Sequence, residues 1–137
     1  MISSELAIRL APHLTWTPKN GDRFFIPKPE MKDSVFTVSD MVVELVEQHG
    51  DRRFHFNGTV EWALDSVGSD DVVWLPHEAQ LRELLGDYFL SLDSAARAYV
   101  VTVSGPGRAH HTEPQAEPAD AYGEALLYVL APQQPTN

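Results

Sequence analysis

Three aspartates between two tryptophans are the residues of this chain whose types and spacing could do chemistry. The stretch FHFNGTVEWALDSVGSDDVVWLP holds Asp65, Asp70 and Asp71 between Trp62 and Trp74. Paired carboxylates can act as general acid and general base, as they do in glycoside hydrolysis. Aromatic rings beside carboxylates can hold a sugar or a cationic ligand. These five residues form the candidate site for a ligand or a protein partner, in a cleft expected between the two tryptophans.

The same stretch also has a purely structural interpretation. The spacing of its carboxylates is unspecific, and the Ser-Asp-Asp sequence at 69–71 is a common way to join two elements. Tryptophans that bracket such a turn are more often part of a core than of a binding cleft. We therefore assign no catalytic residue here.

A second group of polar residues, His110, His111 and Glu113, raises the question of a metal site. Adjacent histidines on a strand point to opposite faces, so His111 and Glu113 could converge on one ion while His110 could not. Two ligands are too few to hold a metal, and the remaining histidines are scattered along the sequence. We expect neither a metal nor a cofactor.

Familiar catalytic motifs do not occur in the sequence. The chain has no cysteine, and no Gly-x-Ser-x-Gly motif is present. Its glycine-rich stretch, Ser104 to Gly107, contains Pro106 and is not followed by the lysine of a phosphate loop. We therefore favour a non-enzymatic binding or adaptor protein. The alternative is a small hydrolase-like enzyme that uses carboxylates in the cleft near Trp62 and Trp74.

The charge of the chain bears on its partner. The formal net charge is −10, which argues against a basic surface for nucleic acid. Lysine and arginine are absent from 54–81 and again from 109 to the end, and both segments contain several acidic residues. If these segments share a face, it would be strongly negative. Such a face serves solubility alone, binds a basic protein partner or mimics nucleic acid.

Turn residues and apolar periodicity predict an α+β fold. We expect a mostly antiparallel sheet of about five or six strands, with three or four helices packed on one side. The expected helices are an N-terminal one that ends before Pro12, one at 60–67, one from Pro76 to Gly86 with Leu81, Leu84 and Leu85 buried, and one from Pro118. The expected strands are 24–26, 35–38, 41–48, 52–56, 72–75, a hairpin formed by 88–92 and 99–104, and a strand end near 108–111. Strand 24–26 is expected at a sheet edge because Pro27 and Pro29 follow it.

Residues 57–67 can form either a helix or a strand. Asn57 and Gly58 favour a hairpin turn, after which alternate apolar residues would lie on a sheet. We prefer the helix, because Thr59 can cap it, apolar residues recur at helical spacing, and Gly68 stands where it would stop.

One α+β domain is expected over 1–131, followed by a disordered tail at 132–137. The sequence has no run of about 18 apolar residues, and Glu5 stands where a signal peptide would have basic residues, so we expect no membrane span and a cytoplasmic protein. Exposed strand edges near the proline-rich segment would permit a homodimer.

Several pieces of the sequence carry a family resemblance. These are LTWTPKNGDRFFIP, FTVSDM, FNGTVEWALDSV, VVWLPHEAQLRELLG and AYGEALLYVL. Together they resemble a family of small actinobacterial proteins that are often labelled as pilus assembly proteins of the Cpa type. The resemblance implies an intracellular protein associated with an ATPase-like assembly component. Because this chain lacks a phosphate loop, no catalytic residue follows from the resemblance.

Overall fold

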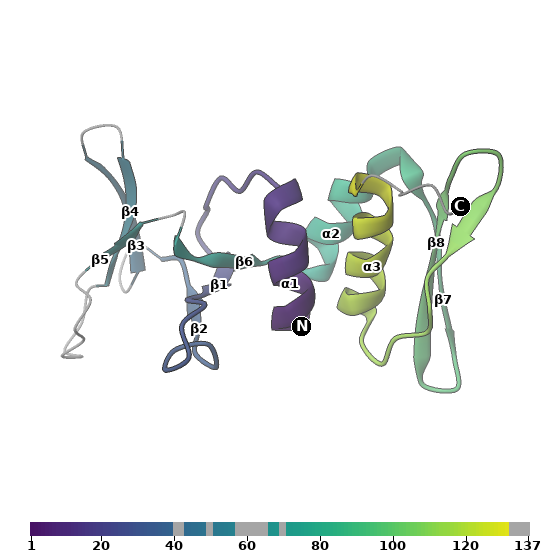
Figure 1. Cartoon of the computed structure of the whole chain (residues 1–137), viewed down its shortest axis with the longest axis horizontal. Coiled ribbons are helices and arrows are strands. Elements are labelled where there is room, and N and C mark those ends of the chain that lie inside the picture. The colour runs from purple at the N-terminus through teal and green to yellow at the C-terminus, as the bar shows by residue number, and fades with distance from the viewer. Residues whose placement is uncertain (40–42, 49–50, 57–65, 69–70, 132–137) are drawn as a thin grey trace, which may run out of the picture. The chain divides into compact units, whose positions relative to one another are not determined.

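A computed structural model describes residues 1–39, 43–48, 51–56, 66–68 and 71–131. The chain divides into two compact units: unit 1 comprises Met1–Thr15 and Pro76–Asn137, and unit 2 comprises Trp16–Leu75 (Figure 1). Unit 2 is therefore an insertion in the sequence of unit 1. Compactness alone does not define a folding domain, so the single domain expected over 1–131 stays a prediction.

The N-terminal helix forms as the sequence predicts. Helix α1 (Ser4–Leu10) begins after Ser3, whose hydroxyl oxygen accepts a hydrogen bond from the backbone amide of Leu6. A short 3-10 turn, Ala11–His13, contains Pro12, which cannot continue the helical hydrogen bonding. The helix therefore ends before Pro12.

The other two helices of unit 1 also follow local signals. Helix α2 (Glu78–Leu85) starts two residues after Pro76 and ends at Gly86, which has a φ of +54°. At its start the backbone amide of His77 donates to the side chain of Gln80, as in a capping box. Helix α3 (Pro118–Leu130) begins with proline at its first position, where the missing N–H costs nothing.

One expected core position in α2 is wrong. Leu81 and Leu85 are buried, whereas Leu84 is 42% exposed. These positions are four residues apart on the helix, so Leu81 and Leu85 face the same way and Leu84 stands beside them. Helix α2 packs against α3, and its buried apolar face is narrower than the sequence suggested.

The sheet of unit 1 has the strand order β7-β8-β9 and is antiparallel. Strands β7 (Phe89–Ala95) and β8 (Ala98–Ser104) confirm the predicted hairpin with a shorter turn, and β9 (Ala109–His111) follows. Helix α3 contacts both β8 and α1, and lies between them in Figure 1. Its buried residues Tyr122, Ala125 and Leu126 share the core with Val101 and Val103 of β8.

Unit 2 contains two antiparallel sheets. In the first, β1 (Arg23–Phe25) lies between β2 (Val35–Thr37) and β6 (Val73–Leu75). The expectation that this strand is an edge strand is therefore wrong. The prolines lie beyond its end, so all three of its residues can pair on both sides. Phe24 and Phe25 are fully buried in this sheet.

The second sheet of unit 2 consists of β3 (Val43–Gln48), β4 (Asp51–Phe56) and β5 (Ser66–Gly68), in that order. The first two confirm predicted strands. The helix expected at 60–67 lies largely outside the described residues, but its last two positions, Ser66 and Val67, belong to β5, so that expectation is wrong there. Pairing with β4 selects the extended backbone for these residues, which local helix signals cannot anticipate.

The fold class is α+β with antiparallel sheets and three α-helices among the described residues. The described strands form three sheets of three strands each, whereas the sequence suggested one sheet of five or six. Strand existence follows from local composition, but sheet membership depends on which strand edges meet in space.

Candidate functional site

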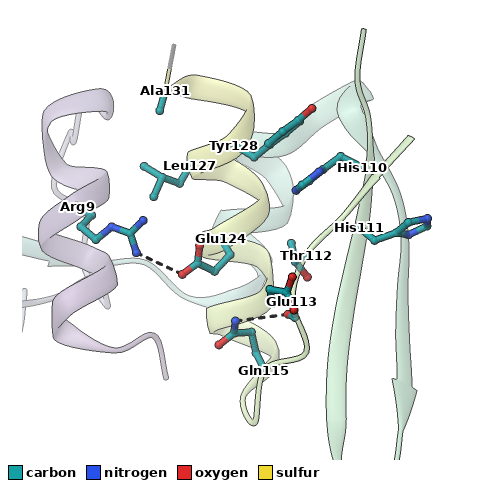
Figure 2. A pocket seen from close by; sticks show the side chains of 10 residues that line it. All are labelled: Arg9, His110, His111, Thr112, Glu113, Gln115, Glu124, Leu127, Tyr128 and Ala131. Atoms are coloured by element: carbon teal, nitrogen blue, oxygen red, sulfur yellow. Dashed lines mark hydrogen bonds and ion pairs between the residues drawn. The ribbon is translucent and has the colours of Figure 1, made fainter. Parts of the chain in front are cut away.

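A polar recess opens in unit 1 between α1, α3 and the segment that follows β8 (Figure 2). Its volume of about 440 Å³ is within the range of small-molecule and peptide-side-chain sites. We call it the polar recess. It is lined by Arg9, His110, His111, Thr112, Glu113, Gln115, Glu124, Leu127, Tyr128 and Ala131.

A stacked pair of rings forms one wall of this recess. The imidazole of His110 and the ring of Tyr128 have centroids 3.6 Å apart and planes that differ by 2°. Strand β9 places His110 level with Val103, whose side chain is buried, so the imidazole points toward α3. Figure 2 shows His110 and Tyr128 side by side. We refer to the pair as the His110–Tyr128 stack.

The position of β9 is fixed by Thr112, the residue after the strand. The buried Thr112 hydroxyl oxygen accepts from the backbone amide of Val101 at 3.0 Å, and the Thr112 amide donates to the Val101 carbonyl oxygen. A side chain thus continues the backbone ladder beyond the strand end. This anchor holds His110 beside Tyr128.

His111 occupies the opposite face of β9, as the alternation of a strand requires. Its Nδ1 lies 2.7 Å from the hydroxyl oxygen of Thr102 on β8. Figure 2 shows its ring directed away from that of His110. The described residues contain no group of three or more histidine, aspartate and glutamate side chains placed to hold a metal ion.

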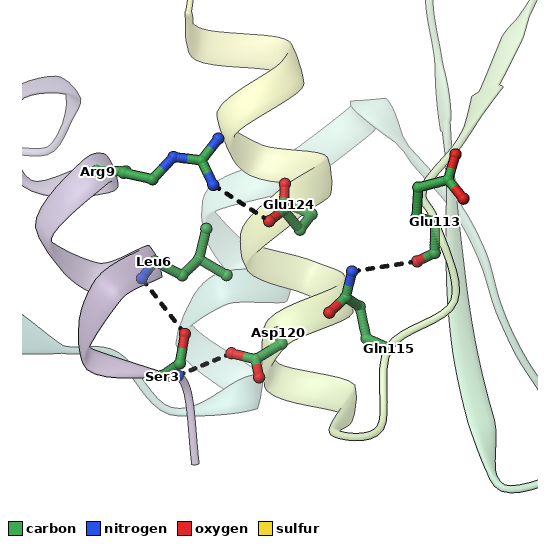
Figure 3. A network of polar contacts seen from close by, with 7 residues as sticks. All are labelled: Ser3, Leu6, Arg9, Glu113, Gln115, Asp120 and Glu124. Carbon is green, nitrogen blue, oxygen red and sulfur yellow. Dashed lines mark hydrogen bonds and ion pairs between the residues drawn. The ribbon is translucent and has the colours of Figure 1, made fainter.

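The acidic residues of α3 contact the N-terminal segment (Figure 3). The backbone amide of Ser3 donates to Asp120 at 2.7 Å, and Arg9 pairs with Glu124 at 3.4 Å. The N-terminal ammonium lies 3.9 Å from Glu117. These groups are largely exposed, so each contact contributes about 0–1 kcal/mol. Three carboxylates that were expected to face a partner therefore already contact residues 1–9 of the same chain.

Glu113 differs from the carboxylates of Glu117, Asp120 and Glu124. Its backbone carbonyl oxygen accepts a 3.4 Å hydrogen bond from the side chain of Gln115, and its own side chain is exposed. Within the described part of the chain, its carboxylate makes no hydrogen bond or ion pair. It is the acidic group of the polar recess with most freedom to meet a cation.

A second recess of about 450 Å³ adjoins the first at Tyr128 and Ala131. We call it the apolar recess. It is lined by Tyr88, Ser104, Gly105, Pro106, Tyr128, Val129, Leu130 and Ala131. A Cβ atom on Gly105 would lie 3.0 Å from the Arg108 carbonyl oxygen and 3.3 Å from the Tyr128 hydroxyl oxygen. Glycine therefore lets the loop between β8 and β9 approach Tyr128 closely.

The site expected from the sequence is only partly described. Trp62, Asp65 and Asp70 lie outside the described residues, so their convergence with the other two stays a prediction. Asp71 is exposed, and Trp74 lies in β6. The alternative hydrolase-like enzyme likewise stays a prediction.

Trp74 takes part in an aromatic cluster of unit 2. Its ring stacks on that of Trp16, with centroids 5.9 Å apart and planes that differ by 6°. The Trp16 indole nitrogen donates to the buried Asp22 at 2.9 Å. The Trp74 indole nitrogen is buried without a hydrogen-bond acceptor among the described residues. Trp74 is therefore a half-buried side chain that stacks on Trp16 within unit 2.

Sequence reasoning missed the site in unit 1. The sequence suggested His110, His111 and Glu113 only as a group to test for metal binding, and it placed Tyr128 only in a predicted helix. The stack joins residues 18 positions apart through the placement of β9 against α3. No periodicity in the sequence carries that information.

Comparison of the chain with known family models, curated proteins and solved structures found no match. In the described stretches of the chain, no helix combines the length and the apolar character needed to cross a bilayer.

Proposed function

We propose that this protein is a non-enzymatic binding protein that holds a short segment of a protein partner at the His110–Tyr128 stack. The observation that carries the proposal is the pair of adjoining recesses that meet at Tyr128. One contains Glu113 and Glu124, and the other is lined mainly by apolar side chains. Such a pair suits a segment with an apolar side chain next to a basic one.

Charge supports this partner chemistry. The chain carries a formal net charge of −10, so a basic segment is attracted before it makes contact. At the polar recess the exposed Glu113 can form a new ion pair without first breaking one. Glu124 already pairs with Arg9, so it contributes less to a newly bound cation. The ATPase-like assembly component implied by the family resemblance is a candidate source of the segment.

Aromatic stacking supports a fixed site. The ring of Tyr128 is already held on one face by His110, so Tyr128 loses little side-chain entropy when a partner binds. Tyrosine is also among the residues that contribute most to binding at protein interfaces.

The proposal is tested with peptides selected from a random displayed library on the full chain. We expect selected peptides to place an apolar residue beside arginine or lysine. Glu113→Lys should weaken their binding about tenfold, because attraction becomes repulsion at one exposed charge. Glu83→Lys is the matched control: it makes the same charge change on α2, outside both recesses, and should leave binding nearly unchanged.

The apolar recess is tested in the same way. Leu130→Glu should weaken binding, whereas Leu84→Glu should not; the two leucines are 38% and 42% exposed. Affinities are measured by fluorescence polarisation at two salt concentrations. Peptides that bind Glu113→Lys and Leu130→Glu as tightly as the unchanged chain would refute the proposal.

A further inference from the structure

Strand β7 forms an open edge of the sheet in unit 1. In the order β7-β8-β9, the described residues give β7 only β8 as a neighbour. With seven residues it is longer than the other described edge strands, β2, β3, β5, β6 and β9. An open edge offers a row of backbone N–H and C=O groups to another strand.

This edge has few of the features that protect edges from pairing. Proteins block edges with lysine, proline, inward-pointing charges or bulges. The sequence FLSLDSA of β7 contains neither lysine nor proline, and its only charge is Asp93. The single irregularity is a register shift between Phe89 and Ser91, so the part from Ser91 onward stays regular.

Exposed apolar side chains accompany the open edge. Leu90 is 54% exposed and Leu92 is 36% exposed, although both are large apolar residues. Leu84 and Tyr88, just before the strand, are exposed as well. A strand added to β7 would remove part of this apolar surface from water.

A second copy of β7 can pair with this edge without placing like charges opposite each other. If a two-fold axis passes beside Leu92 of an antiparallel pair, Leu92 lies opposite its own copy and Asp93 lies opposite Ser91 of the second copy. Within one chain the Ser91 hydroxyl already donates to Asp93 at 3.0 Å, so these two groups are chemically matched. The arrangement places no like charges opposite each other, which would be destabilising.

The two-fold symmetry provides the contact between Asp93 and Ser91 twice, once on each side of the axis.

We propose that two copies of this chain associate through antiparallel pairing of their β7 strands, which joins the two three-stranded sheets into one of six strands. The inference is independent of the peptide-binding proposal, because no β7 residue lines either recess.

Sedimentation velocity of the full chain up to millimolar concentration tests the oligomeric state. We expect a reversible dimer, and Leu92→Lys should shift it to the monomer by placing two lysines together at the axis. Val35→Lys is the control, because Val35 is an exposed apolar residue on β2, another edge strand. A chain that is monomeric throughout overturns the proposal. So does a dimer that only Val35→Lys dissociates.

Charge substitutions at Ser91 test the orientation of the strands. Ser91→Asp should raise the dimer dissociation constant about tenfold, because each new carboxylate lies opposite Asp93 of the second copy. Ser91→Lys should lower the dissociation constant, because each lysine then lies opposite that carboxylate. If both substitutions change the dissociation constant in the same direction, the antiparallel register is wrong.

Cross-linking locates the axis directly. The chain has no cysteine, so Leu92→Cys introduces a single thiol. Cβ atoms of directly opposed residues are about 4.5–5.5 Å apart, slightly more than the roughly 3.5–4.5 Å of an unstrained disulfide. A short bifunctional thiol reagent, which spans the remaining gap, should therefore give a covalent dimer for Leu92→Cys in high yield. An equal yield for the control Val35→Cys would count against the β7 interface.

Discussion

Gly123 of α3 packs against Leu6 of α1 and against Ile2. A Cβ atom there would lie 2.6 Å from Leu6 Cδ2 and 3.1 Å from Ile2 Cδ1. Leu6 and Ile2 are buried, so they have little room to move. A glycine in the middle of a helix is usually unfavourable, and here its small size allows the two helices to pack.

Gly123→Ala should therefore destabilise the protein. Alanine raises helix propensity by about 1 kcal/mol, but the clash with Leu6 costs about 1–3 kcal/mol, and we expect the clash to exceed the gain. The free energy of unfolding in urea measures the net effect.

The Leu6→Ala variant tests whether the clash with Leu6 causes the destabilisation by Gly123→Ala. Alone it should cost about 2–5 kcal/mol through the lost burial. With the Leu6 branch removed, adding Gly123→Ala should be neutral or stabilising. If Gly123→Ala destabilises both backgrounds equally, contact with Leu6 is not the cause.

The two-residue turn of the β7–β8 hairpin requires an unusual backbone conformation. Its two turn residues, Ala96 and Arg97, have φ values of +52° and +62°. Both therefore lie in the left-handed region, which two-residue hairpins use and which suits asparagine and glycine. Antiparallel pairing along the two strands holds the turn in this conformation.

Substitutions at Ala96 should affect stability in opposite directions. Ala96→Asn should stabilise the protein by about 0.5–1 kcal/mol, since asparagine tolerates positive φ. Ala96→Val should destabilise it by about 1–2 kcal/mol, because a β-branched residue is strained there. Thermal unfolding followed by circular dichroism distinguishes them; the same sign for both would contradict the explanation.

At the scale of the whole molecule, unit 1 is completed by residues from the beginning of the chain. Leu6, Ala7 and Leu10 of α1 are buried, and α1 packs against α3. The 60 residues of unit 2 separate α1 from the rest of unit 1 in the sequence. Each unit has its own buried apolar residues, with Phe24 and Phe25 in unit 2 and Leu81 and Leu126 in unit 1.

We predict that unit 1 folds when a flexible glycine-serine linker replaces residues 16–75. Its core then remains complete, so urea unfolding should stay cooperative. Residues 76–137 alone should lose cooperative unfolding, because α3 would expose the surface that α1 covers. If one domain spans 1–131 as a single folding unit, the linked form should fail to fold as well.

The sequence by itself determined several ends of the three described α-helices. Ser3 and Pro12 delimit α1, Gly86 ends α2, and Pro118 starts α3. Caps, prolines and positive-φ glycines act within a few residues of their own position, so the sequence exposes them directly. The β7–β8 hairpin was predictable from its two strand sequences, although its turn contains neither asparagine nor glycine.

Only the tertiary structure decided which elements meet. Four features depend on residues that are distant in the sequence. They are the central place of β1, the extended conformation of Ser66 and Val67, the exposure of Leu84 and the stack of His110 on Tyr128. Their physical basis is pairing and packing between elements, whose free energy overrides weak local preferences. The candidate site belongs to this second group, because its walls are side chains from α1, α3 and the β8–β9 region that only folding brings together.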